Sequence, residues 1–252
     1  MSTQLTGKAA LITGASRGIG AAAAIGLAEA GADNIVLHFN SFRQGAEETA
    51  ERVRATGANV TLIQADLSTM DGVRELMARI QGESFDLLIN NAGHLVQRAK
   101  LLESTEEVYD QVMTLNVKSM WFLTQAVAPA MIERKKGVIV NIGSIAARNG
   151  GGLGATMYSA AKAAVSTFTK GWAKELAPHG IRVNAVSPGT VDNYFHEKHS
   201  TRQLLDSIVA ATPAGRLATN EDVSDVIVFL CSDASRYVHG QTIEVNGGMF
   251  MV

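Results

Sequence analysis

The sequence predicts an α/β protein with a doubly wound Rossmann fold: a single domain with about seven parallel strands flanked by helices. Short runs rich in Val, Ile and Leu alternate along the chain with longer segments of helical character, such as 45–57 and 69–82. The short runs are apolar on both faces, which is typical of a parallel sheet covered by helices on both sides. The expected strands are 9–13, 34–39, 59–66, 85–90, 137–142, 181–187 and 241–245.

These elements use the whole length of the chain and leave no linker, so we expect one domain that spans 1–252. The formal net charge of −2 lacks the strongly basic character expected of a protein that binds nucleic acid. The apolar segment 19–30 is too short for a membrane span, and the N-terminus lacks the pattern of a secretory signal. The single cysteine, Cys231, cannot form an internal disulfide, and its helical apolar context predicts burial. We therefore expect a cytoplasmic protein with neither nucleic acid nor a membrane as a partner.

The first expected strand leads directly into a glycine-rich turn, TGASRGIG at 13–20, which opens a helix. Glycines at this place let backbone N–H groups approach an anion at the helix N-terminus. The spacing of Gly14, Gly18 and Gly20 differs from that of the Gly-x-Gly-x-x-Gly fingerprint, and the Lys-Ser/Thr ending of a triphosphate-binding loop is absent. The context predicts an anion site, and close packing of the turn is the alternative role for these glycines.

The end of the second expected strand bears on the choice of cofactor. An acidic residue there would bind the adenosine ribose hydroxyls, whereas an arginine nearby would accommodate a 2′-phosphate. Phe39 and Asn40 stand where the acid would be sought, and Arg17 and Arg43 are close in sequence. No carboxylate repels a phosphate and two cations could attract it, which favours NADP (NADPH) over NAD.

Further landmarks occur in a fixed order along the whole chain. They are TGASRGIG, Asp66 in QADLS, NNAG at 90–93, Asn116, Ser144, Tyr158, Lys162, Pro-Gly at 188–189 and GQTIEVNGG at 240–248. With these landmarks the chain resembles the short-chain dehydrogenase/reductase family, in its single-domain form. The resemblance implies an NAD(P)-dependent oxidoreductase that transfers a hydride between nicotinamide and a secondary alcohol or ketone.

The resemblance also implies where the cofactor binds. Asp66 and Leu67 would contact the adenine end, NNAG would lie beside the cofactor, and residues after Gly189 would hold the nicotinamide carboxamide. For Asn90, a role in bracing the central strand through side-chain hydrogen bonds is an equal alternative to direct contact. The expected cofactor-binding residues are Gly14, Ser16, Arg17, Gly18, Ile19, Gly20, Asn40, Asp66, Leu67, Asn91, Ala92, Gly93, Tyr158, Lys162, Pro188, Gly189 and Val191.

The expected catalytic residues are Asn116, Ser144, Tyr158 and Lys162. A ketone that accepts a hydride needs a proton at its oxygen, and Tyr158 would supply it as general acid. Lys162 follows one helical turn later, where its ammonium would lower the pKa of the phenol. Ser144 would donate a hydrogen bond to the substrate oxygen, and by the resemblance Asn116 would hold a water that connects Lys162 to solvent.

No metal site is expected. The six histidines lack the spacing of known metal motifs, and His196 and His199, three residues apart, are weak evidence alone. The aromatic residues of the helices beside the active strands are interpreted as core or subunit-interface residues: Trp121, Phe122, Phe168 and Trp172. The resemblance implies a homotetramer built partly through the helices at 116–134 and 158–177 and the C-terminal strand.

We expect a small-molecule substrate that is contacted by 94–102, by 146–157 and by a lid at about 189–217. Asn193 and Asn246 depart from the usual Thr and Asp of the family, which puts the carboxamide contact of Asn193 in doubt. A small polar, cyclic or sugar-derived alcohol or ketone is the main interpretation.

Two other functions stay open. The first is a 3-oxoacyl-(acyl-carrier-protein) reductase, as many similar proteins are; the positions that carry the carrier-binding basic residues in such enzymes are matched here by Leu123 and His179. That match lowers the carrier-protein interpretation, although Arg98, Lys100 and Arg148 could form another basic patch. The second is a non-catalytic NADP-binding sensor or scaffold, against which the intact catalytic set argues.

Overall fold

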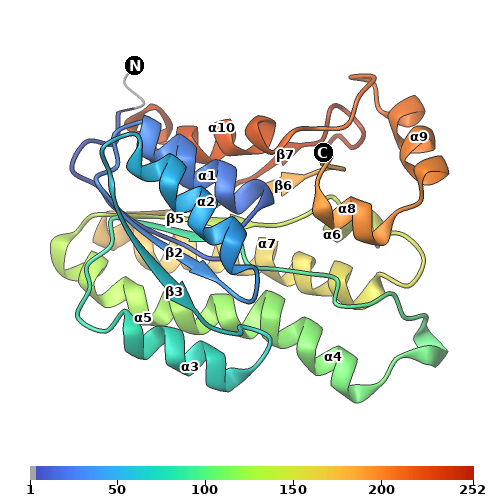
Figure 1. The fold of residues 1–252 in the computed structure, drawn as a ribbon, viewed down its shortest axis with the longest axis horizontal. Coiled ribbons are helices and arrows are strands. Elements are labelled where there is room, and N and C mark those ends of the chain that lie inside the picture. Colours follow the sequence, from blue (N-terminus) through green and yellow to red (C-terminus); the bar gives the residue numbers. More distant parts are fainter. Residues whose placement is uncertain (1–3) are drawn as a thin grey trace.

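The computed structural model describes residues 4–252, so the first three residues of the expected domain 1–252 lie outside the described residues. Seven parallel strands form one sheet in the order β3-β2-β1-β4-β5-β6-β7, with helices on both faces (Figure 1). This confirms the predicted fold class. The strands are β1 (Ala9–Ile12), β2 (Asn34–Phe39), β3 (Asn59–Gln64), β4 (Leu87–Asn90), β5 (Gly137–Ile142), β6 (Ile181–Pro188) and β7 (Thr242–Val245).

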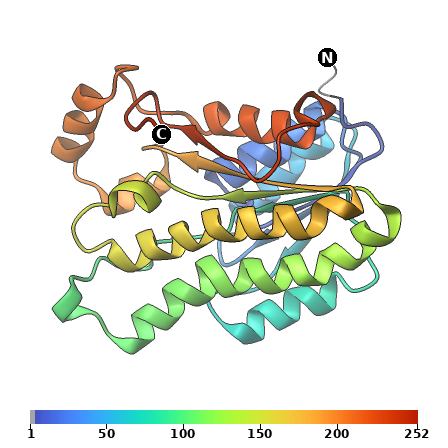
Figure 2. The ribbon, with the colours of Figure 1, turned by 180° about the vertical axis from the view of Figure 1, so that it is seen from behind.

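The helices cover the sheet in two layers, one with α1, α2 and α10 and the other with α3, α4, α5 and α7, and both views show this (Figures 1 and 2). Their bounds are α1 (Gly18–Glu29), α2 (Arg43–Arg54), α3 (Met70–Arg79), α4 (Glu106–Met113), α5 (Ser119–Arg134), α6 (Ala146–Asn149), α7 (Thr156–Leu176), α8 (Tyr194–His199), α9 (Arg202–Ala211) and α10 (Asn220–Cys231). A π-helical turn, Thr114–Lys118, joins α4 to α5. Among the described residues, no helix is long and apolar enough to cross a membrane.

Alternation of side chains along the buried strands creates two hydrophobic cores. Ala10 and Ile12 of β1 pack in the cluster under α1 and α10, whereas Leu11 between them packs in the cluster under α3, α5 and α7. Because successive strand residues point to opposite faces, a strand in such a sheet must be apolar throughout. Cys231 lies buried in the first cluster, as predicted.

A polar ladder crosses the centre of the sheet. The Nδ2 of Asn90 donates to Thr124 Oγ1 at 3.1 Å and to Asn141 Oδ1 at 2.9 Å, and Asn141 Nδ2 donates to Thr169 Oγ1 at 2.9 Å. These bonds pair the amide nitrogens of Asn90 and Asn141 and tie β4 and β5 to α5 and α7, whereas the buried Oδ1 of Asn90 has no partner among the described residues. Asn90 therefore has the bracing role that the sequence left as one of two alternatives.

The sheet order places the site. Strand order reverses between β1 and β4, and the crevice outside the carboxyl ends of such strands is where ligands bind in open α/β sheets. The helices α8 and α9 follow β6 and stand out from the sheet beside its carboxyl end (Figure 1). Four predicted strands are shorter in the structure: 9–13 and 59–66 end earlier and 85–90 and 241–245 begin later, whereas β6 extends one residue beyond the predicted 181–187.

Candidate active site

The glycine-rich turn between β1 and α1 is held in a tight conformation. Gly14 and Gly18 have φ values of +67° and +62°, which favour glycine. A Cβ on Gly20 would lie 2.4 Å from both Gly14 O and Asn91 Nδ2, so this glycine serves the packing of the turn. The first turn of α1 contains no acidic side chain, which leaves its N–H groups and positive dipole end available to an anion.

Two polar side chains brace this turn against the end of β4. The Oγ1 of Thr13 accepts from the N–H groups of Asn91 and Ala92, at 3.0 and 2.9 Å. The Nδ2 of Asn91 donates to the carbonyls of Thr13 and Gly14, at 2.8 and 3.0 Å. Sequence reasoning placed Asn91 at the cofactor and missed Thr13, whose hydroxyl has no sequence signal beyond its place before the first glycine.

A third brace, His38 of β2, was also missed. Its ring contacts Gly14 and Ala65, and the side chain is 2% exposed. A histidine within an apolar strand gave no indication that it would reach the glycine turn.

Arg17 lies between two aromatic rings. Its Cζ is 3.9 Å from the centroid of Phe42 and 4.1 Å from that of Tyr194. Within residues 4–252 no carboxylate forms an ion pair with Arg17. Arg43 stands over Phe39 at 5.3 Å and donates to Gln64 Oε1 at 2.9 Å.

Asn40 and Asp66 meet at the ends of β2 and β3. Asn40 Nδ2 donates to Asp66 Oδ1 at 3.3 Å, and the same oxygen accepts from the N–H and hydroxyl of Ser68. The side chain of Leu67 is 1% exposed and packs in the hydrophobic core, so only its backbone faces this edge. The structure thus brings Asn40, Asp66 and Arg43 to one edge of the expected adenosine site.

The four expected catalytic residues converge from three segments. Tyr158 and Lys162 lie one turn apart in α7, Ser144 follows β5, and Asn116 lies in the π-helical turn. Lys162 is 4% exposed, its Nζ donates to Ile142 O at 2.8 Å, and Nζ lies 5.6 Å from the centroid of the Tyr158 ring.

The pKa of Tyr158 departs from the sequence expectation. Burial raises the pKa of Tyr158 to about 12, and a hydrogen bond with Ser144 only partly opposes this shift. Burial likewise lowers the pKa of Lys162 to about 8. The expected lowering of the phenol pKa by the ammonium is therefore wrong here, because removal from water disfavours both charged forms. A protonated phenol nevertheless suits a general acid.

Two backbone carbonyls fix the orientation of the Asn116 side chain. Its Nδ2 donates to His94 O and Val112 O, each at 2.9 Å, and its buried Oδ1 has no hydrogen-bond partner among the described residues. A Cβ on Gly93 would lie 2.7 Å from this Oδ1 and 2.8 Å from Lys162 Nζ. Any side chain at position 93 would therefore collide with both polar atoms, which explains the glycine at this position.

One cavity of about 400 Å³ runs from the glycine turn to the expected lid. Twelve of the expected cofactor-binding residues and Ser144 line it; the expected residues that do not are Ser16, Gly20, Asn40, Asp66, Leu67 and Asn116. Phe195 of α8 stacks towards Tyr158, with ring centroids 5.9 Å apart. The cavity therefore joins the glycine turn to the catalytic residues and the expected substrate position, whereas the expected adenosine edge lies outside it.

A hydrogen bond joins His94, which lines the cavity, to His199 of α8. His94 Nε2 and His199 Nε2 are 3.1 Å apart, and Arg98 Nε donates to His199 O at 3.2 Å. Burial lowers the pKa of His94 and of His196 to about 4, and neighbouring cations add to this effect. Among the described residues no group of three side chains is placed to hold a metal.

The two departures from the family pattern both have structural partners. Asn193 caps α8 by accepting from Phe195 N–H at 3.1 Å and donates to Asn220 Oδ1 at 3.0 Å. Asn246 organises the turn after β7, where its Oδ1 accepts from Gly248 N–H at 3.1 Å.

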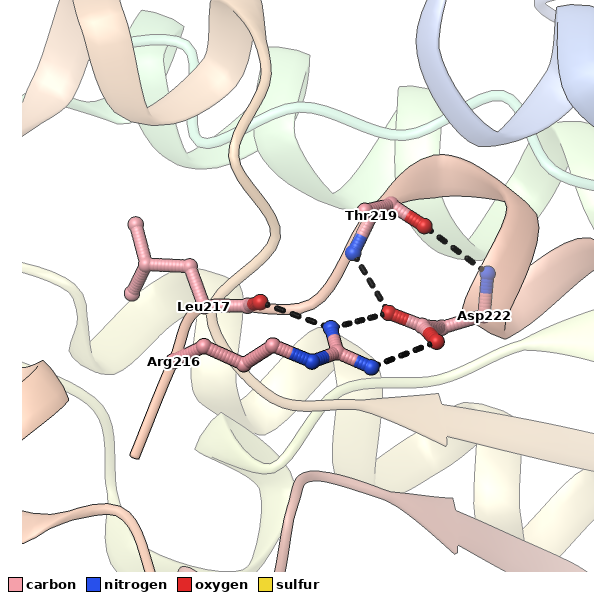
Figure 3. A network of polar contacts seen from close by, with 4 residues as sticks. All are labelled: Arg216, Leu217, Thr219 and Asp222. Carbon is pink, nitrogen blue, oxygen red and sulfur yellow. Dashed lines mark hydrogen bonds and ion pairs between the residues drawn. The ribbon is translucent and has the colours of Figure 1, made fainter. Parts of the chain in front are cut away.

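The chain after α9 is anchored to the start of α10 (Figure 3). Arg216 donates to both carboxylate oxygens of Asp222, and Asp222 also accepts from Thr219 N–H at 2.7 Å in a capping box. These bonds hold the pKa of Asp222 well below its usual range. The far end of the segment 189–217 therefore joins a rigid support.

Comparison with known proteins shows what the chain resembles. Residues 14–250 match a family model described as enoyl-(acyl carrier protein) reductase. The chain is 38% identical over 250 residues to the 3-oxoacyl-(acyl-carrier-protein) reductase of Escherichia coli strain K12, with 98% of each chain covered.

Solved structures agree with this similarity. A gluconate 5-dehydrogenase from Burkholderia cenocepacia J2315 in complex with NADP and tartrate is 33% identical, with a TM-score of 0.89 over 98% of this chain and 97% of that one. A 7α-hydroxysteroid dehydrogenase complexed with NADH and 7-oxo glycochenodeoxycholic acid is 31% identical, with a TM-score of 0.91 over 98% and 96%. We conclude from the fold, the near full-length match and the order of the site segments that the protein belongs to the short-chain dehydrogenase/reductase family and is an NAD(P)-dependent oxidoreductase.

Proposed function

We propose that the protein transfers a hydride between NADP(H) and a small secondary alcohol or ketone, with Tyr158 as general acid and base. The observation that carries this proposal is the convergence of Tyr158, Ser144 and Lys162 on a cavity that also includes the glycine turn. A hydride donor and a proton donor can then act on one carbonyl within one enclosed space.

In the reductive direction the bound dinucleotide supplies the hydride. Tyr158 has a phenol that is protonated near neutral pH and whose pKa burial raises further, and it gives its proton to the carbonyl oxygen as negative charge develops there. Ser144 donates a hydrogen bond to the same oxygen. Lys162, held through Ile142 O, stands beside the phenol and would re-supply the proton, with the Oδ1 of Asn116, which lacks a hydrogen-bond partner in the described part of the chain, placed to hold the water that leads to solvent.

Three features support NADP over NAD. Asn40 rather than an acid ends β2, Arg17 is free of carboxylate partners within residues 4–252, and Arg43 lies at the same edge. A 2′-phosphate would meet the two cations there, and the carboxylates of this edge already have partners: Asp66 accepts from Asn40 and Ser68, and Glu47 pairs with Arg43. The similar gluconate 5-dehydrogenase contains NADP, whereas the similar hydroxysteroid dehydrogenase contains NADH.

The cavity supports a polar substrate. His94, Arg98, Asn149 and His196 line it together with the apolar ring of Phe195. Polar groups at a cavity wall orient hydroxyl-rich ligands. A sugar-derived ketone agrees with these groups and with the name of the similar gluconate 5-dehydrogenase.

A second candidate function, reduction of 3-oxoacyl groups on acyl carrier protein, is favoured by the curated relatives of that name. The sequence argument against this candidate used Leu123 as the match for a carrier-binding basic residue. Leu123 is 1% exposed, so its position could not contact a carrier protein and its identity no longer argues against the candidate. Activity on an acyl-carrier-protein thioester that exceeds activity on every small ketone would select this candidate.

The test is turnover of a panel of sugar-derived, cyclic and thioester ketones with NADPH and with NADH. We expect a lower KM for NADPH than for NADH, and loss of about 10²- to 10⁴-fold in kcat in Tyr158→Phe with cofactor binding retained. Dinucleotide binding without turnover of any carbonyl, and without any effect of Tyr158→Phe, would instead indicate the sensor or scaffold.

Three architectural proposals accompany the function. We infer that 1–252 acts as one domain, that the segment 189–217 with α8 and α9 closes over the substrate, and that four copies assemble. The lid proposal is supported by α8, which presents Phe195 to Tyr158, and by residues of α9 that line the cavity.

A further inference from the structure

His38 links three segments that lie far apart in sequence. Its Nδ1 lies 3.1 Å from Gly14 N, its Nε2 lies 3.0 Å from Ala65 O, and its own carbonyl accepts from Ala15 N–H at 2.9 Å. The residue lies near the end of β2, between the glycine turn that follows β1 and the chain that leaves β3. One buried side chain therefore connects the two parts of the expected dinucleotide site.

The partners determine which nitrogen carries the proton. A backbone N–H can only donate, so the Nδ1 that faces Gly14 must be an unprotonated acceptor. A carbonyl can only accept, so the Nε2 that faces Ala65 must carry hydrogen. Burial lowers the pKa of His38 to about 4, which keeps this neutral form at physiological pH.

The two hydrogen bonds of the His38 ring contact Gly14 in the glycine turn and Ala65 next to the adenosine edge. Gly14 begins the glycine turn with a left-handed φ of +67°, and a Cβ there would lie 3.1 Å from Ala92 Cα. Ala65 directly precedes Asp66, which ties the end of β3 to Asn40. A shift at either end of the imidazole would thus change the distance between the glycine turn and the adenosine edge.

We propose that His38 is a positioning residue for the dinucleotide, which sets the glycine turn through Gly14 and the adenosine edge through Ala65. The inference rests on the proposed function, because it requires that this turn holds the cofactor. An ordinary buried histidine would affect only stability, whereas a positioning residue affects cofactor affinity beyond its effect on stability. The two roles are therefore separable by measurement.

The first test compares His38→Leu with the wild-type protein. Leucine has a similar volume and no acceptor, so the N–H of Gly14 loses its partner. We expect the Kd and KM for NADPH to rise about tenfold or more, with kcat at saturating NADPH within about twofold of wild type. The control is Val183→Ala, a fully buried site on β6, four strands away from β2, which lowers Tm but leaves the Kd for NADPH unchanged.

The second test uses the two amides. The Oδ1 of His38→Asn can stand near the Nδ1 position and accept from Gly14, whereas the amide of His38→Gln reaches towards Ala65. We expect His38→Asn to bind NADPH more tightly than His38→Gln, and this comparison remains available if His38→Leu does not fold.

The inference is overturned if the Kd for NADPH in His38→Leu stays within twofold of wild type. It is also overturned if His38→Gln binds at least as well as His38→Asn, or if Val183→Ala weakens binding as much as His38→Leu. If wild-type protein binds neither NADPH nor NADH, the proposed function is wrong and this inference is wrong as well. Normal binding by all variants overturns the inference alone.

Discussion

Burial governs the titratable side chains around the site. It raises the pKa of Tyr158 and lowers the pKa of Lys162, so both groups move towards their neutral forms. The histidines follow the same rule, with the pKa of His38 lowered to about 4. Removal of these side chains from water therefore affects both their protonation in the site and the dependence of folding stability on pH.

A pH dependence of stability follows from His38. The pKa of an unfolded histidine is about 6.5, so between pH 6.5 and 4 the unfolded chain binds more protons than the folded one. Stability present above pH 6.5 is therefore lost as pH falls, on the order of 2 kcal/mol at pH 5 for this residue. We expect calorimetry at pH 7 and pH 5 to give a smaller fall in Tm for His38→Asn than for wild type. Equal falls in the two proteins would contradict this assignment.

At the scale of the element, two helical glycines have opposite surroundings. A Cβ on Gly20 of α1 would meet Gly14 O and Asn91 Nδ2 at 2.4 Å, whereas a Cβ on Gly171 of α7 would meet nothing within 4 Å. We expect Gly20→Ala to lower the free energy of unfolding by about 1–3 kcal/mol and to weaken NADPH binding. Gly171→Ala is the matched control, with a gain of about 0.5–1 kcal/mol from helix propensity. Urea titration of both variants checks the difference, and equal effects would refute it.

The helix α8, which belongs to the proposed lid, is tied to the chain after β4 by the two histidines. Val96 N–H donates to His94 Nδ1 at 2.9 Å, so His94 carries its proton on Nε2 and donates it to His199 Nε2. A proton gained at His199 Nε2 would therefore break this bond. We expect His199→Leu to raise the KM for substrate several-fold, with the KM for NADPH unchanged, in steady-state kinetics.

The control for the lid is His179→Leu, at an exposed position next to β6. A KM for substrate that is the same in His199→Leu as in wild type would show that the histidine bond does not hold the lid. A comparable increase in the KM for substrate in His179→Leu would also show that the histidine bond does not hold the lid.

At the scale of the whole molecule, an aromatic cluster lies on α5 and α7. Trp121 stands 5.1 Å from Phe168 and 5.5 Å from Trp172 between ring centroids, and it is 40% exposed. Half-exposed aromatic groups on adjacent helices are typical of subunit interfaces. We expect analytical ultracentrifugation to give the mass of four chains for wild type and a smaller assembly for Trp121→Glu. Leu204→Glu, at an exposed position of α9, is the control that should leave the mass unchanged.

The fold was predictable because its signals are local. The order of apolar and polar residues along the chain indicates strands that are buried on both faces and the helices between them. The seven expected runs correspond to β1 to β7. The pair Tyr158 and Lys162 is equally local, since helical periodicity alone puts the two side chains one turn apart. Ser144 and Asn116 needed the family resemblance, because no period connects them to α7.

Sequence by itself therefore determined the sheet, the glycine turn and the residue types of the catalytic set. Tertiary structure alone decided which residues support them: Arg17 between Phe42 and Tyr194, His38 between Gly14 and Ala65, and His94 against His199. It also decided the pKa of Tyr158, which the pair spacing had suggested with the wrong sign. The physical reason is common to all four: contact between distant segments and removal from water arise only when the chain is folded, and no local pattern records them.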